Sequence, residues 1–340
     1  MGFAREPPRF AIRSNPDPLE CSMFRAGLLF IVVCASLITP LAYADVPADL
    51  SSVQLQLDPD RVQWRYLKLK ARKFLLTATS EAWLDLVDLD QVESEIITPE
   101  QGAGVAPEPR LVRMQSTTRF FGRKSVMKLL MNPSNGRAVQ EALDHRGGDR
   151  TKHRIFRYTD TGIFVLTYRP MNEAENDLPW PDWTRISPEW RTIEKQAYGL
   201  PIVLPFGLLY VVGAADIAPG KPPARLLSIS DRKITYLELV AYAARPRTVD
   251  FMLNGPDGTR RCKGRLPAIR IGIRGQPVDP TLDTRFEFLG LEKDIQIYIE
   301  PETRIVLEVS GKAPIVGHLV IRTKEATVTG PGGCPLIQAG

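Results

Sequence analysis

The chain is 340 residues long, has a formal net charge of +5 and contains only three histidines and four cysteines. This charge surplus is too small to indicate a nucleic-acid partner, and we predict none. Histidines and cysteines are also too few for a typical metal site, so we predict neither a metal nor a cofactor.

Residues 1–44 have the layout of a secretory signal peptide. Arg25 precedes an apolar run at 26–35, and Ala-Tyr-Ala at 42–44 supplies the small-x-small pattern of a cleavage site. We predict cleavage after this motif and a secreted, periplasmic mature protein. An uncleaved anchor is the alternative, because the apolar run approaches the ~20 residues that span a bilayer. Translation from Met23 instead of the first methionine would give a signal of ordinary length, and both starts stay open.

The exported part, residues 45–340, holds 40 basic and 36 acidic side chains and therefore carries a charge of +4. A chain of this size can bury a substantial core, and we predict a single β-rich domain, with two smaller domains as the alternative. Cys262 and Cys334 are the two cysteines of this part. In an oxidising compartment they predict one disulfide bond, and two unrelated thiols are the alternative.

Alternating side chains predict strands through much of the first half. Leu67, Leu69 and Ala71 alternate with Lys68, Lys70 and Arg72, which indicates a strand with a basic outer face. The segment from 93 to 110 has neither helical nor strand periodicity and is predicted to be a long surface loop. Further strands are expected at 82–89, 111–119, 123–131, 154–158 and 163–168, while 138–143 fits a strand or a short helix.

The middle of the chain, near 170–217, is predicted to be a helical insertion rich in Trp and Pro. Ser187-Pro188-Glu189 offers a capping hydroxyl followed by proline at the first helical position, which predicts a helix that ends near Gly199. A short buried helix is expected around 206–215, where the sequence is mostly apolar.

The C-terminal part again alternates like strands. Ile295, Ile297 and Ile299 share one face, and Pro301 in the following turn predicts a hairpin with the strand that contains Leu307 and Val309. Strands at 234–243, 248–253 and 268–274 precede this hairpin. The fold class is therefore mainly β (α+β), with an antiparallel meander at its end.

The order of elements from Leu200 to Val328 resembles a family of secreted bacterial proteins grouped under a domain of unknown function. Arg304 beside Ile305, and Leu307-Glu308-Val309-Ser310-Gly311, carry the likeness. The sheet of this family is similar to the half-barrel of periplasmic lipoprotein carriers. The resemblance implies a curved antiparallel sheet with one or two helices across its concave face, and it implies no catalytic residues.

Catalytic and metal-binding motifs are absent from the sequence. His145 and His153 lie among arginines and lysines and are expected on a solvated basic face, and His318 is expected on the polar side of a strand. No nucleophile motif accompanies these histidines, so we predict that the protein is not an enzyme. Acidic residues at 85, 88 and 90 lack the spacing of a calcium loop and are expected on the surface.

Apolar and aromatic residues of the middle segment are the candidate ligand-binding residues. These are Trp180, Trp183, Phe206, Leu209 and Tyr210. They fill the core or line a cavity for an acyl chain, and the sequence leaves both interpretations open. Two basic surfaces also leave two interpretations open, the strand face at 68–72 and the basic residues at 260–265. Each is expected to contact either anionic lipid headgroups or only solvent.

The leading hypothesis is an exported, non-enzymatic protein that binds a hydrophobic or lipid-like component of the cell envelope. A lipid or a lipoprotein is the expected partner, with peripheral membrane contact. A structural or adaptor protein of the envelope, with a protein partner, is the main alternative, and a β-rich hydrolase is a third.

Overall fold

The computed structural model describes residues 46–47, 49–73, 76–120, 123–146, 151–230, 233–281, 286–314, 316–330 and 334. All of them belong to one unit, Tyr43–Gly340. The predicted signal peptide at 1–44 lies outside the described residues.

Strands dominate this unit, as the alternating sequence predicts, and 17 of them form one sheet. Their bounds are β1 Trp64–Lys73, β2 Leu76–Asp88, β3 Arg110–Phe120, β4 Arg123–Met131, β5 Ala138–Arg146, β6 Lys152–Tyr158, β7 Gly162–Arg169, β8 Arg185–Thr192, β9 Ile202–Val203, β10 Ala224–Ser230, β11 Lys233–Tyr242, β12 Arg247–Gly255, β13 Gly258–Leu266, β14 Ile269–Pro277, β15 Lys293–Ile299, β16 Val306–Ala313 and β17 Gly317–Val328. The helices are α1, Glu173–Asn176, and α2, Leu208–Ala214.

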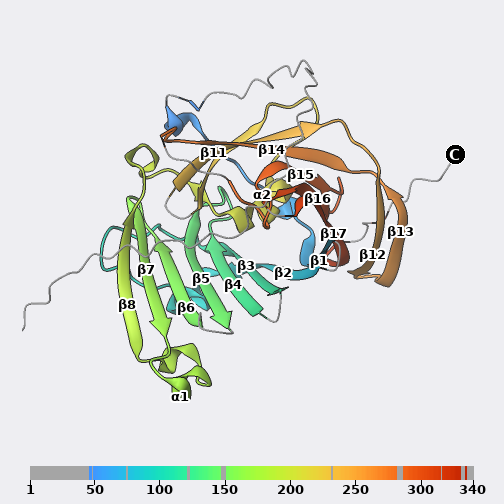
Figure 1. Cartoon of the computed structure of the whole chain (residues 1–340). Coiled ribbons are helices and arrows are strands. Elements are labelled where there is room, and N and C mark those ends of the chain that lie inside the picture. Colours follow the sequence, from blue (N-terminus) through green and yellow to red (C-terminus); the bar gives the residue numbers. More distant parts are fainter. Residues whose placement is uncertain are drawn as a thin grey trace, which may run out of the picture. The chain divides into compact units, whose positions relative to one another are not determined.

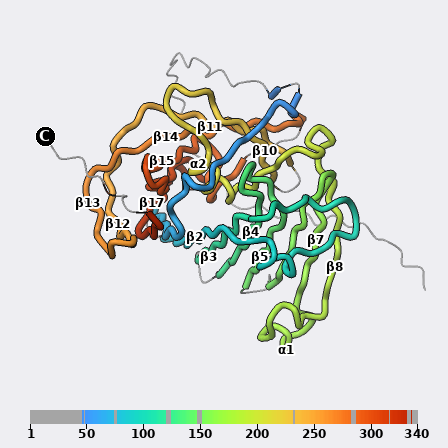
Figure 2. Tube along the Cα trace, turned by 180° about the vertical axis from the view of Figure 1, so that it is seen from behind, coloured from blue at the N-terminus to red at the C-terminus, as the bar shows by residue number. Residues whose placement is uncertain are grey.

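The sheet is almost entirely antiparallel. Strands β1 to β8 pair in chain order, and β1 also pairs with β17, which joins them to the run β16, β15, β14, β11 and β10. Two pairings are parallel: β9 with β10, and β12 with the end of β17. Figures 1 and 2 show from two sides that the strands bend around α2, so the mainly β class and the curved sheet are confirmed.

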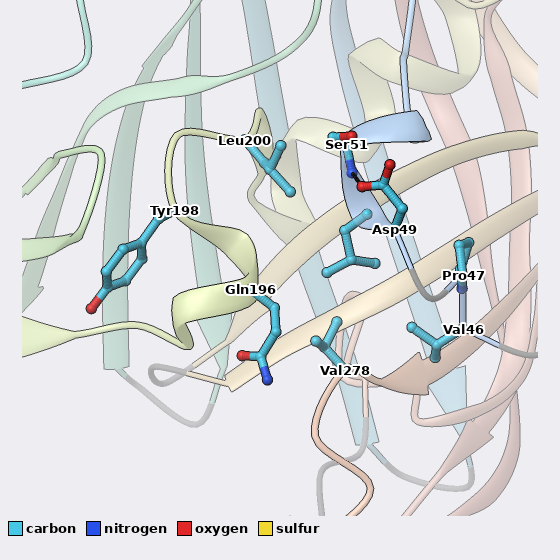
Figure 3. Close-up of a pocket in the computed structure, with 9 residues that line it drawn as sticks. Val46, Pro47, Asp49, Ser51, Gln196, Tyr198, Leu200 and Val278 are labelled. Atoms are coloured by element: carbon cyan, nitrogen blue, oxygen red, sulfur yellow. Dashed lines mark hydrogen bonds between the residues drawn. The ribbon is translucent and has the colours of Figure 1, made fainter.

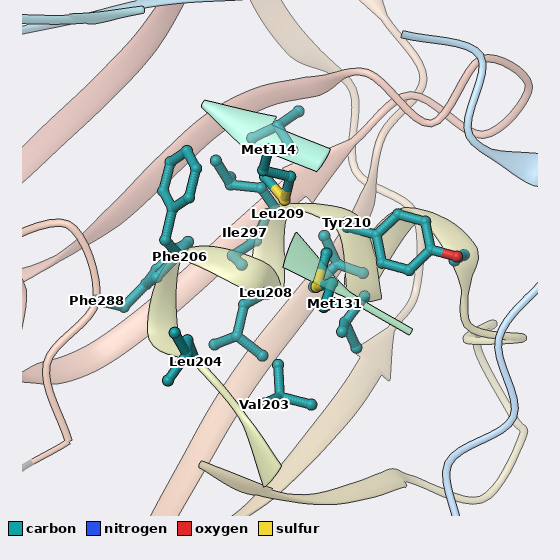
Figure 4. Close-up of a cluster of buried hydrophobic side chains, with 14 of the residues drawn as sticks. Met114, Met131, Val203, Leu204, Phe206, Leu208, Leu209, Tyr210, Phe288 and Ile297 are labelled. Atoms are coloured by element: carbon teal, nitrogen blue, oxygen red, sulfur yellow. The ribbon is translucent and has the colours of Figure 1, made fainter. Parts of the chain in front are cut away.

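Helix α2 lies in the hydrophobic core on the concave side of the sheet. All of its 7 residues are buried, and the Tyr210 hydroxyl is the one polar group among their side chains. Its entry is tight, because a Cβ added at Gly207 would lie 3.2 Å from Sδ of Met131 on β4. Figure 4 shows the side chains of α2 among residues of β3, β4 and β15, including Met114, Met131 and Ile297. The predicted short buried helix is therefore confirmed.

The helix predicted to begin at Ser187 is wrong. Residues Arg185–Thr192 form strand β8, which pairs with β7 in a register that sets Pro188 opposite Leu166. Among the described residues β8 has a partner on one side only, and an edge strand tolerates a proline because it has no second ladder to supply with N–H donors. The segment 138–143, which was ambiguous, lies within strand β5.

The predicted long loop between β2 and β3 is fixed to the sheet by three polar side chains. Arg157 of β6 is buried and donates to the carbonyls of Ile97, Val105, Val139 and Tyr158 over 2.7–3.2 Å. Similarly, Gln140 of β5 donates to the Glu95 carbonyl and accepts from the Ile97 amide, and Asn132 bonds Ala106 and Glu108. We call residues 96–109 the anchored loop.

Two further findings concern the disulfide bond and membrane-spanning helices. Cys262 on β13 and Cys334 form a disulfide bond with their Cα atoms 6.0 Å apart, as predicted. Within the described ranges, no helix combines the length and the apolar character needed to cross a bilayer.

Candidate functional site

The five candidate ligand-binding residues fall into two separate places. Phe206, Leu209 and Tyr210 lie in the core around α2, where Leu209 and Tyr210 are fully buried. The Tyr210 hydroxyl donates to the Pro133 carbonyl over 2.8 Å, and burial raises the pKa of this phenol. These three side chains therefore pack against protein, and their role in ligand binding stays a prediction.

Trp180 and Trp183 lie instead in the insertion between β7 and β8. Trp183 is buried, and its Nε1 donates to the Glu175 carbonyl of α1 over 2.7 Å, a bond within the insertion. Trp180, in the 3-10 turn Trp180–Asp182, is half-buried and faces the sheet from the side opposite α2.

A groove of about 560 Å³ crosses the outer face of β3 to β7. Antiparallel pairing places Gln115, Lys128, Ala142 and Ile155 in one row across neighbouring strands. A second row, two residues along each strand, holds Val126, Asp144, His153 and Tyr168. Side chains two apart on a strand share a face, so both rows form the floor, and Leu130 and Gln140 continue it.

The walls of the groove come from segments far apart in sequence. Ile97 of the anchored loop, with Ser94 and Glu95 just before this loop, forms one wall, and Trp180 closes the other end. Lys128 on the floor forms an ion pair with Glu95 of the wall. Because Gln140 and Arg157 hold the anchored loop, this wall has a fixed position against the sheet.

The Trp180 end of the groove is an aromatic cluster around His153. The imidazole of His153 stacks on the indole of Trp180 with ring centroids 4.0 Å apart and planes within 2°. Tyr168 meets Trp180 edge-on at 5.0 Å. His153 is only 6% exposed, and burial lowers the pKa of its imidazole to about 4, so the ring is neutral near pH 7.

The expectation that His153 lies on a solvated basic face is wrong. Lys152 and Arg154 flank it in the sequence, but neighbouring strand residues face opposite sides of a sheet, so these charges point away from the groove. His145 lies on the α2 side of β5, where its Nδ1 is 3.1 Å from Ser125 Oγ. The partner that defines the environment of His153 is Trp180, 27 positions later, and no local sequence pattern predicts this contact.

Two other hollows lack the features of the groove. One, of about 500 Å³, lies beside residues 46–51 and contains an Asp49 side chain whose Oδ1 already accepts from the Ser51 amide (Figure 3). Another, of about 300 Å³, lies over β15 to β17, where Glu308 pairs with Arg247 and Arg322. In both, the hydrogen-bonding groups named here are already used by neighbouring protein atoms.

The described residues contain no group of three or more His, Cys, Asp or Glu side chains arranged to hold a metal ion. Asp85 and Asp88 are exposed and pair with Arg113 and Arg110 on β3, over 3.2 and 3.5 Å. The four basic residues between 260 and 265 are likewise exposed, and Arg261 pairs with Asp250 at 2.8 Å.

Comparisons with known proteins add no relative. The chain matches no protein-family model, no curated protein and no solved structure.

Proposed function

We propose that this chain is an exported, non-enzymatic protein that binds a hydrophobic or lipid-like component of the cell envelope in the groove on β3 to β7. The observation that supports this proposal is the group of four apolar side chains, Val126, Leu130, Ala142 and Ile155, among the polar side chains of the floor. A volume of about 560 Å³ lies within the ~300–1,000 Å³ typical of small-molecule sites.

The groove is a better site for the ligand than the concave side of the sheet. Side chains of α2 already fill that side, and the hydroxyl of Tyr210 is satisfied by a backbone carbonyl. The groove, in contrast, has solvent above a floor that includes apolar side chains. The Cys262–Cys334 disulfide agrees with an oxidising compartment, as expected for an exported chain.

A substitution that fills the groove tests the proposal. Ala142→Trp places a large side chain on the floor without removing any core contact of α2, and Thr248→Trp is the matched control at an exposed position on β12. The probe is a neutral dansyl amide of a long-chain amine, followed by fluorescence titration. We expect Ala142→Trp to weaken binding by about tenfold or more, a loss of about 1.4 kcal/mol, and the control to bind like the wild type.

Equal binding by all three proteins, or no binding by any of them, would contradict the proposal. Native mass spectrometry of protein purified from the envelope gives a second readout, because a carrier should retain a copurifying amphiphile. Consistently ligand-free protein would count against a binding function.

The adaptor alternative has one observation in its favour. Met171, Leu178 and Ile186 are 67%, 41% and 53% exposed, and all lie around α1 at the end of the β7–β8 pair farthest from α2. Exposed apolar side chains that cluster can mark a protein interface. A photo-crosslinking residue at position 178 distinguishes the two functions in cells, because an adaptor should trap a specific protein there and a lipid carrier should not.

A further inference from the structure

We infer that the ligand of the groove carries a neutral, hydroxyl-rich head group, such as a sugar ring, which binds at the His153 end. This inference rests on the proposed function and specifies the chemistry of the ligand. It depends on three observations: the buried polar atoms of His153 and Asp144 that have no partner, the charge balance of the groove, and the position of Trp180.

Neither Nδ1 nor Nε2 of the His153 imidazole has a hydrogen-bond partner among the described residues, although both nitrogens are buried and the residue is only 6% exposed. Each unsatisfied buried polar atom costs about 1–3 kcal/mol. Buried polar groups in folded proteins are nearly always paired, so this exception needs an explanation. A ligand that bonds to the imidazole would supply it.

Asp144 lies directly opposite His153 in the register of β5 and β6. Its Oδ2 is 3.4 Å from Nε of Arg146, whereas its Oδ1 is buried and has no partner in the described part of the chain. A carboxylate accepts hydrogen bonds only, and a neutral imidazole both donates and accepts. Adjacent hydroxyl groups, which also donate and accept, match this pair.

The charge of the groove disfavours an anionic head group. Lys128 is the only cation among the described lining residues, and it already pairs with Glu95. Beside His153, the Arg146 guanidinium pairs with Asp144 over 3.4 Å, so a phosphate or carboxylate there would compete with Asp144 for a cation that is already used. Neutral hydroxyl groups avoid this repulsion, since they donate to the carboxylate.

Trp180 provides the flat apolar surface on which a sugar ring packs. Its indole covers one face of the imidazole, whereas Nδ1 and Nε2 bond in the plane of that ring, so hydroxyl groups approach them at the ring edge beside Trp180. The bond from Trp183 to the Glu175 carbonyl keeps the segment around Trp180 in place. Polar bonds at the edge and an aromatic face above are together suited to a ring with hydroxyl groups around it.

Three amphiphiles with the same chain test the inference: octyl glucoside, octyl tetraethylene glycol ether and octylphosphocholine. Isothermal titration calorimetry below the critical micelle concentration of each gives the affinities. We expect octyl glucoside to bind about tenfold or more tightly than the other two, because it alone satisfies His153 and Asp144. Its binding should also change the fluorescence of the wild type, and Trp180→Phe should reduce this change.

Two variants locate the preference. His153→Phe keeps a ring beneath Trp180 but removes both nitrogens, and Asp144→Asn keeps the shape of the side chain but removes its charge. Each should bring the ratio of glucoside to ether affinity close to one while affinity for the ether stays unchanged. His153→Phe also buries no unsatisfied atom, so its thermal stability at pH 7 should match or exceed that of the wild type.

The outcomes separate the two proposals. If all three amphiphiles bind equally, if octylphosphocholine binds most tightly, or if the preference persists in both variants, the inference is overturned and the apolar groove stays supported. If none binds, the proposed function fails and the inference fails with it.

Discussion

Glu141 gives the sharpest test of how this sheet responds to pH. Its side chain lies on the α2 side of β5, between the cross-strand neighbours Leu129 and Phe156, and accepts a hydrogen bond from the Tyr158 hydroxyl over 3.3 Å. Burial raises the pKa of this carboxyl from 4.5 to about 7, against smaller lowering effects from Tyr158 and Arg154. Glu141→Gln replaces the carboxyl with an amide that stays neutral and still accepts from the tyrosine.

The magnitude follows from the two pKa values. The folded protein holds the Glu141 proton up to about pH 7, whereas the unfolded chain releases it from about pH 4.5. The free energy of unfolding therefore falls as the pH rises through this window, and above pH 7 the loss reaches about 3 kcal/mol. The glutamine variant has no such proton, so its free energy of unfolding should not fall in this window. Between pH 4 and pH 8, the difference in unfolding free energy between the variant and the wild type should therefore shift by about 3 kcal/mol in favour of the variant.

Urea unfolding followed by circular dichroism at pH 4, 6 and 8 measures this difference. Other titrating groups are common to both proteins and cancel in the comparison. Glu100→Gln, at an exposed position in the anchored loop, is the control and should show no change with pH. A difference between Glu141→Gln and the wild type that is the same at pH 4 and pH 8 would refute the reasoning.

The remaining predictions concern His153, Arg157 and the disulfide. His153 has a pKa of about 4 in the folded state and 6.5 when unfolded, so the free energy of unfolding should fall by about 3 kcal/mol as the pH drops from above 6.5 to 4. Urea unfolding of His153→Phe should not show this fall. Arg157→Met should lower the free energy of unfolding by at least about 3 kcal/mol, because buried carbonyls lose their donors, and limited proteolysis should then cut the anchored loop. Cys262→Ser should cost about 4 kcal/mol, given the separation of 72 residues from Cys334, and dithiothreitol should bring the wild type to the same melting temperature.

The strands were predictable because their side chains alternate locally. The hairpin from Ile295 to Val309, the strands at 154–158 and 163–168 and the helix around Tyr210 each depend on a short stretch of sequence, and each is present in the fold. Strand β8 was not predictable in this way. Ser187-Pro188-Glu189 satisfies the local rules for a helix start, but pairing with β7 prevails.

The candidate site was predictable only in part. Trp180 belongs to it, as proposed from the aromatic composition of the insertion, while the floor comes from strands β3 to β7 and depends on their register. The charged neighbours of His153 in the sequence suggest a solvated side chain, whereas strand geometry sends them to the other face. Register and long-range packing set this environment, and neither can be derived from a local pattern.

The anchored loop has a consequence for how tightly the groove can hold a guest molecule. Ordering a flexible segment costs roughly 1–2 kcal/mol of backbone entropy for each residue fixed, and many receptors incur this cost at the moment of association. Here the cost falls on folding instead, because Gln140 and Arg157 immobilise the wall beforehand through their bonds to Glu95 and Ile97. Loosening either of these two anchors should therefore weaken association even though none of the contacts made to the guest molecule is lost.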